Sequence, residues 1–392
     1  MTKALLRTLH PLGPVGAQGL AQAVNLAAQL SLLALLGRAG FGDLVLGLLA
    51  ATSVAFLGEM GFGSYFLRQS ASPRDWLSPW REAVVFRLLA LTVLGGLAWH
   101  VLGAAAPDPA VSRRVLLAAL PGLAATAVNP LPLLFGLGHT RLASASVVAR
   151  AVVQAVAGVG GALLWPAAAD LLLGLGFSAG ILLQVVCGRL AGLPAAVLLP
   201  RRPRAMPPFP ALRLWGLSLV GILSDRALPF LVSDLRPQVL APALIVVQVL
   251  QAMAGIVAQV DRVLVPATVR GADPVLTWRM LRAPLAVLAA LMCLALPMLA
   301  WLFLPGQHWA ALLLALEWSM MMTSALTFPL TFAVGREGTA AAFMLGAVPF
   351  SILAQVALGA WQGLEPVLAL RVAVAATLAW LTIRSLETRR VS

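Results

Sequence analysis

The chain has 392 residues, of which 61% are hydrophobic and only 10% are charged, and its formal net charge at pH 7 is +13. A soluble globular domain carries about 25% charged residues, so this composition excludes an ordinary soluble protein and indicates a polytopic membrane protein. In such a chain, excess positive charge predicts membrane topology and not nucleic-acid binding.

Apolar segments of about 20 residues, the length that crosses a bilayer as a helix, recur along the whole chain. They predict an all-α polytopic membrane protein with about twelve transmembrane helices in two six-helix bundles. The predicted spans are 14–36, 44–67, 83–104, 115–137, 142–165, 170–199, 214–233, 240–266, 283–304, 309–333, 339–360 and 364–383.

A Pro-rich and Arg-rich stretch, residues 198–213, separates the sixth predicted span from the seventh. Such a composition is typical of a linker. It predicts a six-helix bundle in residues 1–199, a cytoplasmic linker in 200–213 and a second six-helix bundle in 214–392.

Basic residues gather in one set of the loops that join the spans. If the N-terminus is cytoplasmic, seventeen Lys and Arg residues lie on the cytoplasmic side and four lie in outer loops. Because cytoplasmic loops of membrane proteins carry an excess of Lys and Arg, we expect both termini in the cytoplasm.

Four amide side chains interrupt the otherwise apolar first span. On a helix they fall within an arc of roughly 60°, and we call them the amide stripe: Gln18, Gln22, Asn25 and Gln29. The stripe either faces a hydrated cavity, where amides hydrogen-bond sugar hydroxyls, or bonds to neighbouring helices at about 0.6 kcal/mol per contact. Hydrogen bonds this weak would hardly explain four amides on one face of the helix, so we favour the cavity.

Six arginines remain inside the predicted spans. Each needs a partner, a route to the interface or a water-filled cavity, because an arginine at the bilayer centre costs about 2.5–3.5 kcal/mol on insertion scales. Arg87 and Arg371 lie near span ends, so we expect their side chains to reach the interface. The other four either pair with acids or line a cationic cavity that holds a lipid diphosphate: Arg150, Arg189, Arg226 and Arg262.

Four acidic residues also lie inside spans: Glu59, Asp225, Asp261 and Glu317. A carboxyl group in an apolar site can couple transport to H+ or Na+, and Glu59, Asp261 and Asp225 are the candidates. Pairing with a nearby arginine is the alternative. Glu59 and Asp261 fall at corresponding positions when the two halves are aligned, so they are the first to test.

The sequence lacks the motifs of an enzyme. It contains no phosphate-binding loop, nucleophile motif or zinc-ligand spacing, and its outer loops are too short to carry a catalytic domain. We therefore expect no enzymatic activity, no cofactor, no metal and no nucleic-acid partner.

Two glycine-rich motifs flank the second span. The first helix ends in a Leu-Gly turn followed by a Gly-aromatic-Gly, and the second ends in an acid-x-Gly-x-Gly run followed by an arginine: Gly37, Gly40, Phe41, Gly42, Glu59, Gly61, Gly63 and Arg68. This pattern resembles polysaccharide exporters of the multidrug/oligosaccharidyl-lipid/polysaccharide (MOP) transporter superfamily. More faintly, Asp225 with Arg226, and the Pro-containing exit at 262–270, are similar to the second half of that family.

The resemblance implies a flippase for lipid-diphosphate-linked oligosaccharide units, such as O-antigen units of lipopolysaccharide, in the bacterial inner membrane. Two bundles would alternately open a cavity to each side. The arginines would hold the diphosphate and the amide stripe the sugars, with membrane lipids around the protein. The alternatives are a cation-coupled drug or metabolite antiporter of the same superfamily, a membrane glycosyltransferase or ligase, and a membrane scaffold.

Overall fold

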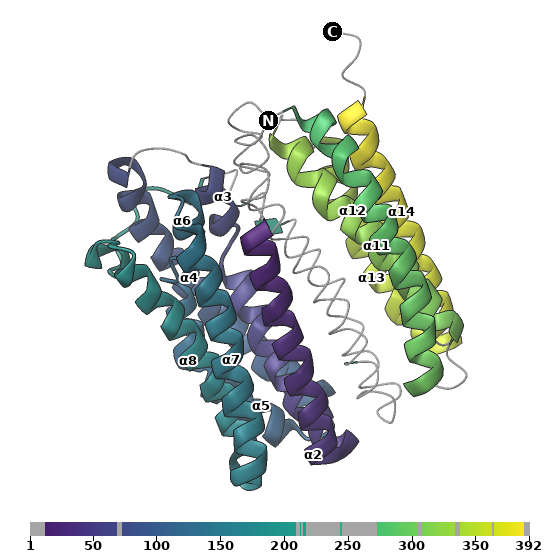
Figure 1. Cartoon of the computed structure of the whole chain (residues 1–392), viewed down its shortest axis with the longest axis horizontal. Coiled ribbons are helices and arrows are strands. Elements are labelled where there is room, and N and C mark those ends of the chain that lie inside the picture. Colours follow the sequence, from purple (N-terminus) through teal and green to yellow (C-terminus); the bar gives the residue numbers. More distant parts are fainter. Residues whose placement is uncertain are drawn as a thin grey trace. The chain divides into compact units, whose positions relative to one another are not determined.

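The computed structural model describes residues 12–68, 73–208, 212, 215–216, 244, 273–303, 308–333, 338–362 and 364–387. These residues fall into two compact units, an N-terminal unit up to residue 244 and a C-terminal unit from residue 273 (Figure 1). The predicted spans 214–233 and 240–266 lie almost entirely outside the described residues. The predicted domain boundaries at 199 and 214 stay predictions.

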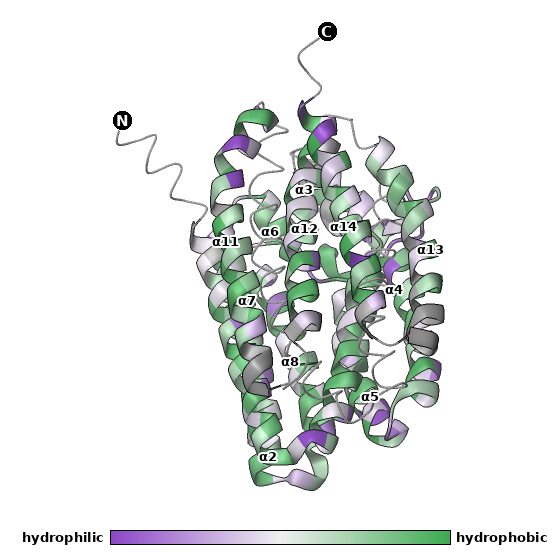
Figure 2. Ribbon diagram, turned by 90° about the vertical axis from the view of Figure 1, so that its right-hand side faces the viewer, coloured by the Kyte–Doolittle hydropathy of each residue, from purple (hydrophilic) through white to green (hydrophobic). Residues whose placement is uncertain are grey.

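The described helices present apolar side chains on their outer surfaces. Eight helices in the described part are long and apolar enough to cross a membrane. Side chains such as Val93, Leu294 and Phe350 are more than two-thirds exposed, at 71%, 71% and 74%. Figure 2 shows hydrophobic residues along the helices and most of the strongly hydrophilic residues towards helix ends. This distribution is that of a multi-pass membrane protein.

The first two predicted spans form one helical element, α2 (Leu12–Gly58), with a kink. At the kink, Gly37 has φ 70° and ψ 179°, a conformation that a side chain would strain. The chain therefore changes direction at the Leu-Gly turn that the sequence predicts, between spans 14–36 and 44–67.

The rest of the N-terminal unit contains helices that pack closely through small residues. A Cβ atom on Gly122 would lie 2.6 Å from Ser178 Cα, and one on Gly176 would lie 2.5 Å from Ala157 Cβ. Only residues of this size let helix axes approach so closely. The elements are α4 (Pro73–Ala105), α5 (Pro109–Thr126), α6 (Leu131–Gly136), α7 (Thr140–Leu164) and α8 (Ala169–Leu190), with 3-10 turns η1 (Pro166–Ala168) and η2 (Ala195–Leu198).

In the C-terminal unit, α14 packs against α12 and α13. Trp278, Leu330 and Leu386 form a buried apolar cluster, and Thr327 of α12 donates a hydrogen bond of 2.6 Å to Thr382 of α14. The four helices correspond to the last four predicted spans: α11 (Pro274–Phe303), α12 (His308–Ala333), α13 (Gly338–Gln362) and α14 (Leu364–Glu387).

Candidate functional site

Two predicted spans of the N-terminal unit are interrupted. After α2 ends at Gly58, Met60 and Gly61 have φ 50° and 69°, and α3 (Phe62–Arg68) begins. Left-handed backbone ends a helix, so the prediction of one continuous span over 44–67 is wrong. The Trp215 indole donates a hydrogen bond of 2.8 Å to the carbonyl oxygen of Leu57 at the end of α2, which satisfies one terminal acceptor.

The predicted span 115–137 is also interrupted, because α5 ends at Thr126 and α6 begins at Leu131. Pro130 has no N–H group, and the Asn129 side-chain oxygen accepts the Leu131 N–H at 3.1 Å. Asn129 also donates to Gln184 of α8 at 2.9 Å. The short helices α3 and α6 contact each other, so the two interruptions meet in one region. In transporters, interrupted helices often form ion or substrate sites.

Glu59 lies in the first interruption and its side chain is half-buried. Its Oε2 atom occupies the space beside Gly63, 2.7 Å from where a Cβ would stand, and Pro132 Cγ of α6 lies 3.5 Å from the same point. The Glu59 carboxylate makes no ion pair with any residue that the structure describes. The carboxylate that the sequence selects for ion coupling therefore lies against α3 and α6 without a direct cationic partner there.

Arg87 of α4 lies beside this region and is 1% exposed, so the prediction that its side chain reaches the interface is wrong. Its Nη1 donates a hydrogen bond of 3.2 Å to the Ala127 carbonyl oxygen, at the second interruption. The guanidinium carbon lies 4.4 Å from the Trp80 ring centroid and 5.5 Å from that of Phe62. Glu59 is the acidic group that acts on it electrostatically. Aromatic rings and a carbonyl therefore shelter this charge from lipid.

Two donors of Arg87 have no hydrogen-bond partner within the described part of the chain, namely Nε and Nη2. We call this pair of donors the Arg87 fork. A buried donor without an acceptor costs about 1–3 kcal/mol. One signal in the sequence points to the burial of Arg87, because Trp80 precedes it by two helical turns and shares its face.

The amide stripe lies on the first half of α2. Gln18, Gln22 and Asn25 are half-buried, whereas Gln29 is 7% exposed. The Oε1 atom of Gln29 is buried and accepts no hydrogen bond from a described residue. One turn further on, Leu32 packs towards Gly158 of α7. Along the stripe, exposure therefore falls from Gln18 to Gln29, and the buried Gln29 oxygen can accept a hydrogen bond.

Arg150 and Arg189 lie on adjacent helices but are not brought together. The half-buried Arg150 of α7 places its stem against Gly180 and its guanidinium carbon 5.4 Å from the Phe177 ring centroid of α8. Arg189 lies about 14 Å further along α8 than Gly180. Its Nη1 donates to the Leu193 carbonyl oxygen after the helix end. Arg150 is therefore held by an aromatic ring, and Arg189 caps its own helix.

Four predicted site residues lie outside the described residues: Arg226, Arg262, Asp225 and Asp261. Their roles in substrate binding and ion coupling stay predictions.

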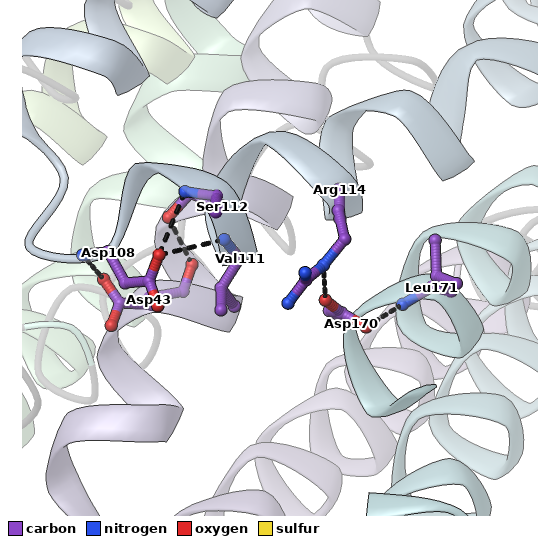
Figure 3. A network of polar contacts seen from close by, with 8 residues as sticks. Asp43, Asp108, Val111, Ser112, Arg114, Asp170 and Leu171 are labelled. Atoms are coloured by element: carbon purple, nitrogen blue, oxygen red, sulfur yellow. Dashed lines mark hydrogen bonds and ion pairs between the residues drawn. The ribbon is translucent and has the colours of Figure 1, made fainter. Parts of the chain in front are cut away.

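A polar network that the sequence did not predict joins α2 to α5 just after the kink of α2, far from the end of α2 at Gly58 (Figure 3). Asp43 is 8% exposed, and its Oδ1 accepts the Asp108 N–H at 2.9 Å. Ser112 donates to the Asp43 carbonyl oxygen at 2.9 Å. Asp108 itself caps α5 by accepting from Ala110 and Val111. Asp43 lies about 24 Å along the helix from Glu59, so the network is separate from the interruptions.

A second contact in Figure 3 joins α5 to α8, where Arg114 forms an ion pair with Asp170. Asp170 is 5% exposed, and its Oδ1 also accepts the Leu171 N–H at 2.8 Å. The contact joins the N-terminal parts of α5 and α8, at the end of the unit that the basic-residue count predicts to lie on the outer side.

Arg371 and Glu317 form a buried ion pair in the C-terminal unit. Arg371 Nε donates to Glu317 Oε2 at 2.9 Å, and Nη2 lies 2.6 Å from Oε1. The side chains are only 2% and 3% exposed. The prediction that Arg371 reaches the interface is therefore wrong, since α12 supplies a carboxylate at the same depth.

No protein-family model and no curated protein matches the sequence, whereas solved structures match its fold. A multidrug resistance MATE family transporter of the MOP superfamily in an outward-facing conformation has a TM-score of 0.66 with 13% identity, over 97% of this chain and 96% of that chain. The fold is that of MOP-superfamily transporters. The predicted fold class, an all-α polytopic membrane protein of this type, is confirmed.

Two further MOP-type structures match over nearly their whole length. A MATE structure in the straight conformation has a TM-score of 0.64 and 15% identity, covering 98% of this chain and 96% of that one. A MOP superfamily transporter from Pyrococcus furiosus Vc1 (DSM3638), described as having a binding pocket of reversed polarity that suggests a different function, has a TM-score of 0.63 and 13% identity, covering 96% and 95%. At these identities the likeness is one of fold.

Proposed function

We propose that the protein flips lipid-diphosphate-linked oligosaccharide units across the bacterial inner membrane by alternating access. The MOP-type fold supports transport, and the glycine-rich motifs around the second span support the polysaccharide branch of the superfamily. The excess of basic residues in one set of loops supports cytoplasmic termini.

The observation that carries the choice of substrate is the amide stripe with its buried acceptor. Sugar hydroxyls are donors, and Gln29 Oε1 is an acceptor that no described residue uses. Half-buried amides at Gln18, Gln22 and Asn25 extend the same face of α2. A neutral drug-like ligand would not need such a row of amides, whereas an oligosaccharide presents hydroxyl groups at each ring.

Arg150 is the described residue best suited to the diphosphate. Its half-buried guanidinium lies over the Phe177 ring of α8, and the planar fork of a guanidinium matches the geometry of phosphate oxygens. We assign Arg226 and Arg262 to the same role. Arg189 serves this role less well, because it donates to the carbonyl oxygen of Leu193.

The experiment is transport of a fluorescent lipid-diphosphate-linked oligosaccharide in proteoliposomes, measured as the fraction that an added glycosidase can reach over time. We expect Gln29→Leu to lower the initial rate about three- to tenfold, the effect of losing one hydrogen bond. The matched control is Gln154→Leu, a half-buried amide on α7 outside the stripe. Equal rates for wild type and Gln29→Leu would reject the stripe as a sugar site.

The second candidate function is cation-coupled export of a drug or metabolite. The match to a multidrug resistance MATE structure supports this function about as well as it supports the flippase. In the same liposomes, this function predicts accumulation of a fluorescent organic cation driven by a Na+ or H+ gradient. Transport of the organic cation without movement of the lipid-linked oligosaccharide would favour the antiporter and overturn the flippase.

A further inference from the structure

The chain that follows α8 returns to the start of α4 and is fastened there by hydrogen bonds. The Trp80 indole donates to the Val197 carbonyl oxygen at 3.1 Å, and Arg81 Nε donates to the Leu199 carbonyl oxygen at 3.0 Å. The Arg201 N–H then donates to the Arg81 carbonyl oxygen at 3.0 Å. Residues 197–201 are therefore held against α4 by main-chain atoms.

Side chains extend this attachment as far as residue 204. Arg201 Nη1 donates to Ser78 Oγ at 3.0 Å, and the Arg204 N–H donates to Glu82 Oε2 at 3.4 Å. Glu82 Oε1 accepts from Ser78 Oγ at 3.3 Å. The acidic group that faces this segment is thus already engaged with a hydroxyl and a main-chain amide.

The attached segment displays positive charge at the end of a membrane span. Ser78 and Glu82 lie within the first two turns of a candidate span that begins at Trp76, so the segment lies where that span leaves the bilayer. Arg202 and Arg204 are exposed. Beyond them the side chain of Met206 is 81% exposed.

We propose that residues 201–206 form a binding surface for anionic phospholipid headgroups of the leaflet at this end of the spans. Arg202 and Arg204 bind headgroup phosphates, and Arg81 and Arg201 add to the local positive potential. Met206 enters the acyl boundary beside them. The main chain of residues 197–204 is bonded to α4, so the headgroups meet a positioned segment and only the exposed side chains become ordered on binding. The proposal holds for either candidate substrate.

The test titrates the purified full-length protein in detergent with phosphatidylglycerol or phosphatidylcholine and counts bound lipids by native mass spectrometry. Wild type should prefer phosphatidylglycerol, and Arg202→Gln combined with Arg204→Gln should lower that preference at least fivefold, since each arginine near a charged membrane surface contributes about a fivefold effect. Met206→Ser should weaken binding of both lipids.

The matched control is Arg38→Gln, an exposed arginine beside the kink of α2, which should leave the preference unchanged. Thermal unfolding of the double variant checks that the fold is kept, as expected because the main-chain bonds of residues 201 and 204 are retained. An unchanged preference in the folded double variant, or an equal loss in Arg38→Gln, would overturn the proposal.

Discussion

Arg371 in the C-terminal unit and Arg87 in the N-terminal unit are both buried in apolar helices, at 3% and 1% exposed, but they are satisfied in opposite ways. Arg371 uses Nε and Nη2 to bind both oxygens of Glu317. Arg87 has the same two donors free of any described acceptor and is sheltered by Trp80, Phe62 and one carbonyl oxygen.

The surroundings of the two arginines differ as well. Arg371 and Glu317 lie within the uninterrupted helices α14 and α12, where a closed ion pair joins two rigid elements. Arg87 lies where two interrupted spans meet, and the Glu59 carboxylate, which forms no ion pair with a described residue, acts on it from the turn between α2 and α3. The comparison teaches that a buried arginine can be satisfied by a carboxylate on a neighbouring helix or sheltered by aromatic rings and a carbonyl oxygen.

The largest expected effect is on the closed pair. Glu317→Gln removes the carboxylate charge that binds the buried Arg371 guanidinium, and breaking a buried ion pair costs about 3–5 kcal/mol of unfolding free energy. Denaturant unfolding of the protein in detergent measures it. Glu387→Gln, an exposed acid at the end of α14, is the control and should change little. The combination of Glu317→Leu with Arg371→Met should recover most of the unfolding free energy that Glu317→Gln loses. If stability is not recovered, the two residues also depend on other neighbours.

Arg87→Met should cost less, about 1–2 kcal/mol, because it removes one hydrogen bond and two ring contacts but also two buried donors that no described residue satisfies. The parallel variant Arg371→Met removes the arginine that binds the Glu317 carboxylate. It should be clearly more destabilised in the same unfolding assay. If Arg87→Met is as destabilising as Arg371→Met, the Arg87 fork has an acceptor and the comparison fails.

Asp170→Asn should cost about 1 kcal/mol or less, because the Arg114 side chain is 51% exposed and solvent screens the pair. High salt should shrink the difference between this variant and wild type in the unfolding assay, while the effect of Glu317→Gln should persist. A salt-independent loss would mean that the Asp170 contact with Leu171 N–H, and not the ion pair, carries the effect.

Glu59→Gln should have the smallest effect on stability, under about 0.5 kcal/mol, because the carboxylate makes no direct ion pair among the described residues. If Glu59 couples transport to a cation, the variant should lose its response to an imposed Na+ or H+ gradient in proteoliposomes. A folded variant with the gradient response of wild type would exclude Glu59 from coupling.

The sequence predicted several of the described helices closely. Hydropathy is a sum over neighbouring residues, so α7, α12 and α13 follow their predicted spans, whereas α8 ends at Leu190, before the end of the predicted span 170–199. The kink at Gly37 was also predictable, because a glycine in a short turn signals a change of chain direction. The interruptions after Gly58 and Thr126 were missed, although Glu59 with Gly61, and Asn129 with Pro130, signal a break, because the apolar residues on both sides dominate the hydropathy of a 20-residue span.

The candidate site was predicted less completely, because its contacts join residues far apart in the sequence. The regular spacing of the amide stripe needs only one helix, so the sequence by itself placed those four residues on one face. The burial of Gln29 and the contact of Arg150 with Phe177 depend on how α2, α7 and α8 pack.

The sequence by itself determined that this is a membrane protein of many helices, and it determined which residues are polar enough to need a partner there. Only the tertiary structure decided that Arg371 meets Glu317, 54 residues away, and that Arg87 lies under Trp80 between two interruptions. The reason is physical: apolarity adds up along the chain, whereas the partner of a buried charge is set by the rotation and register of helices packed against each other.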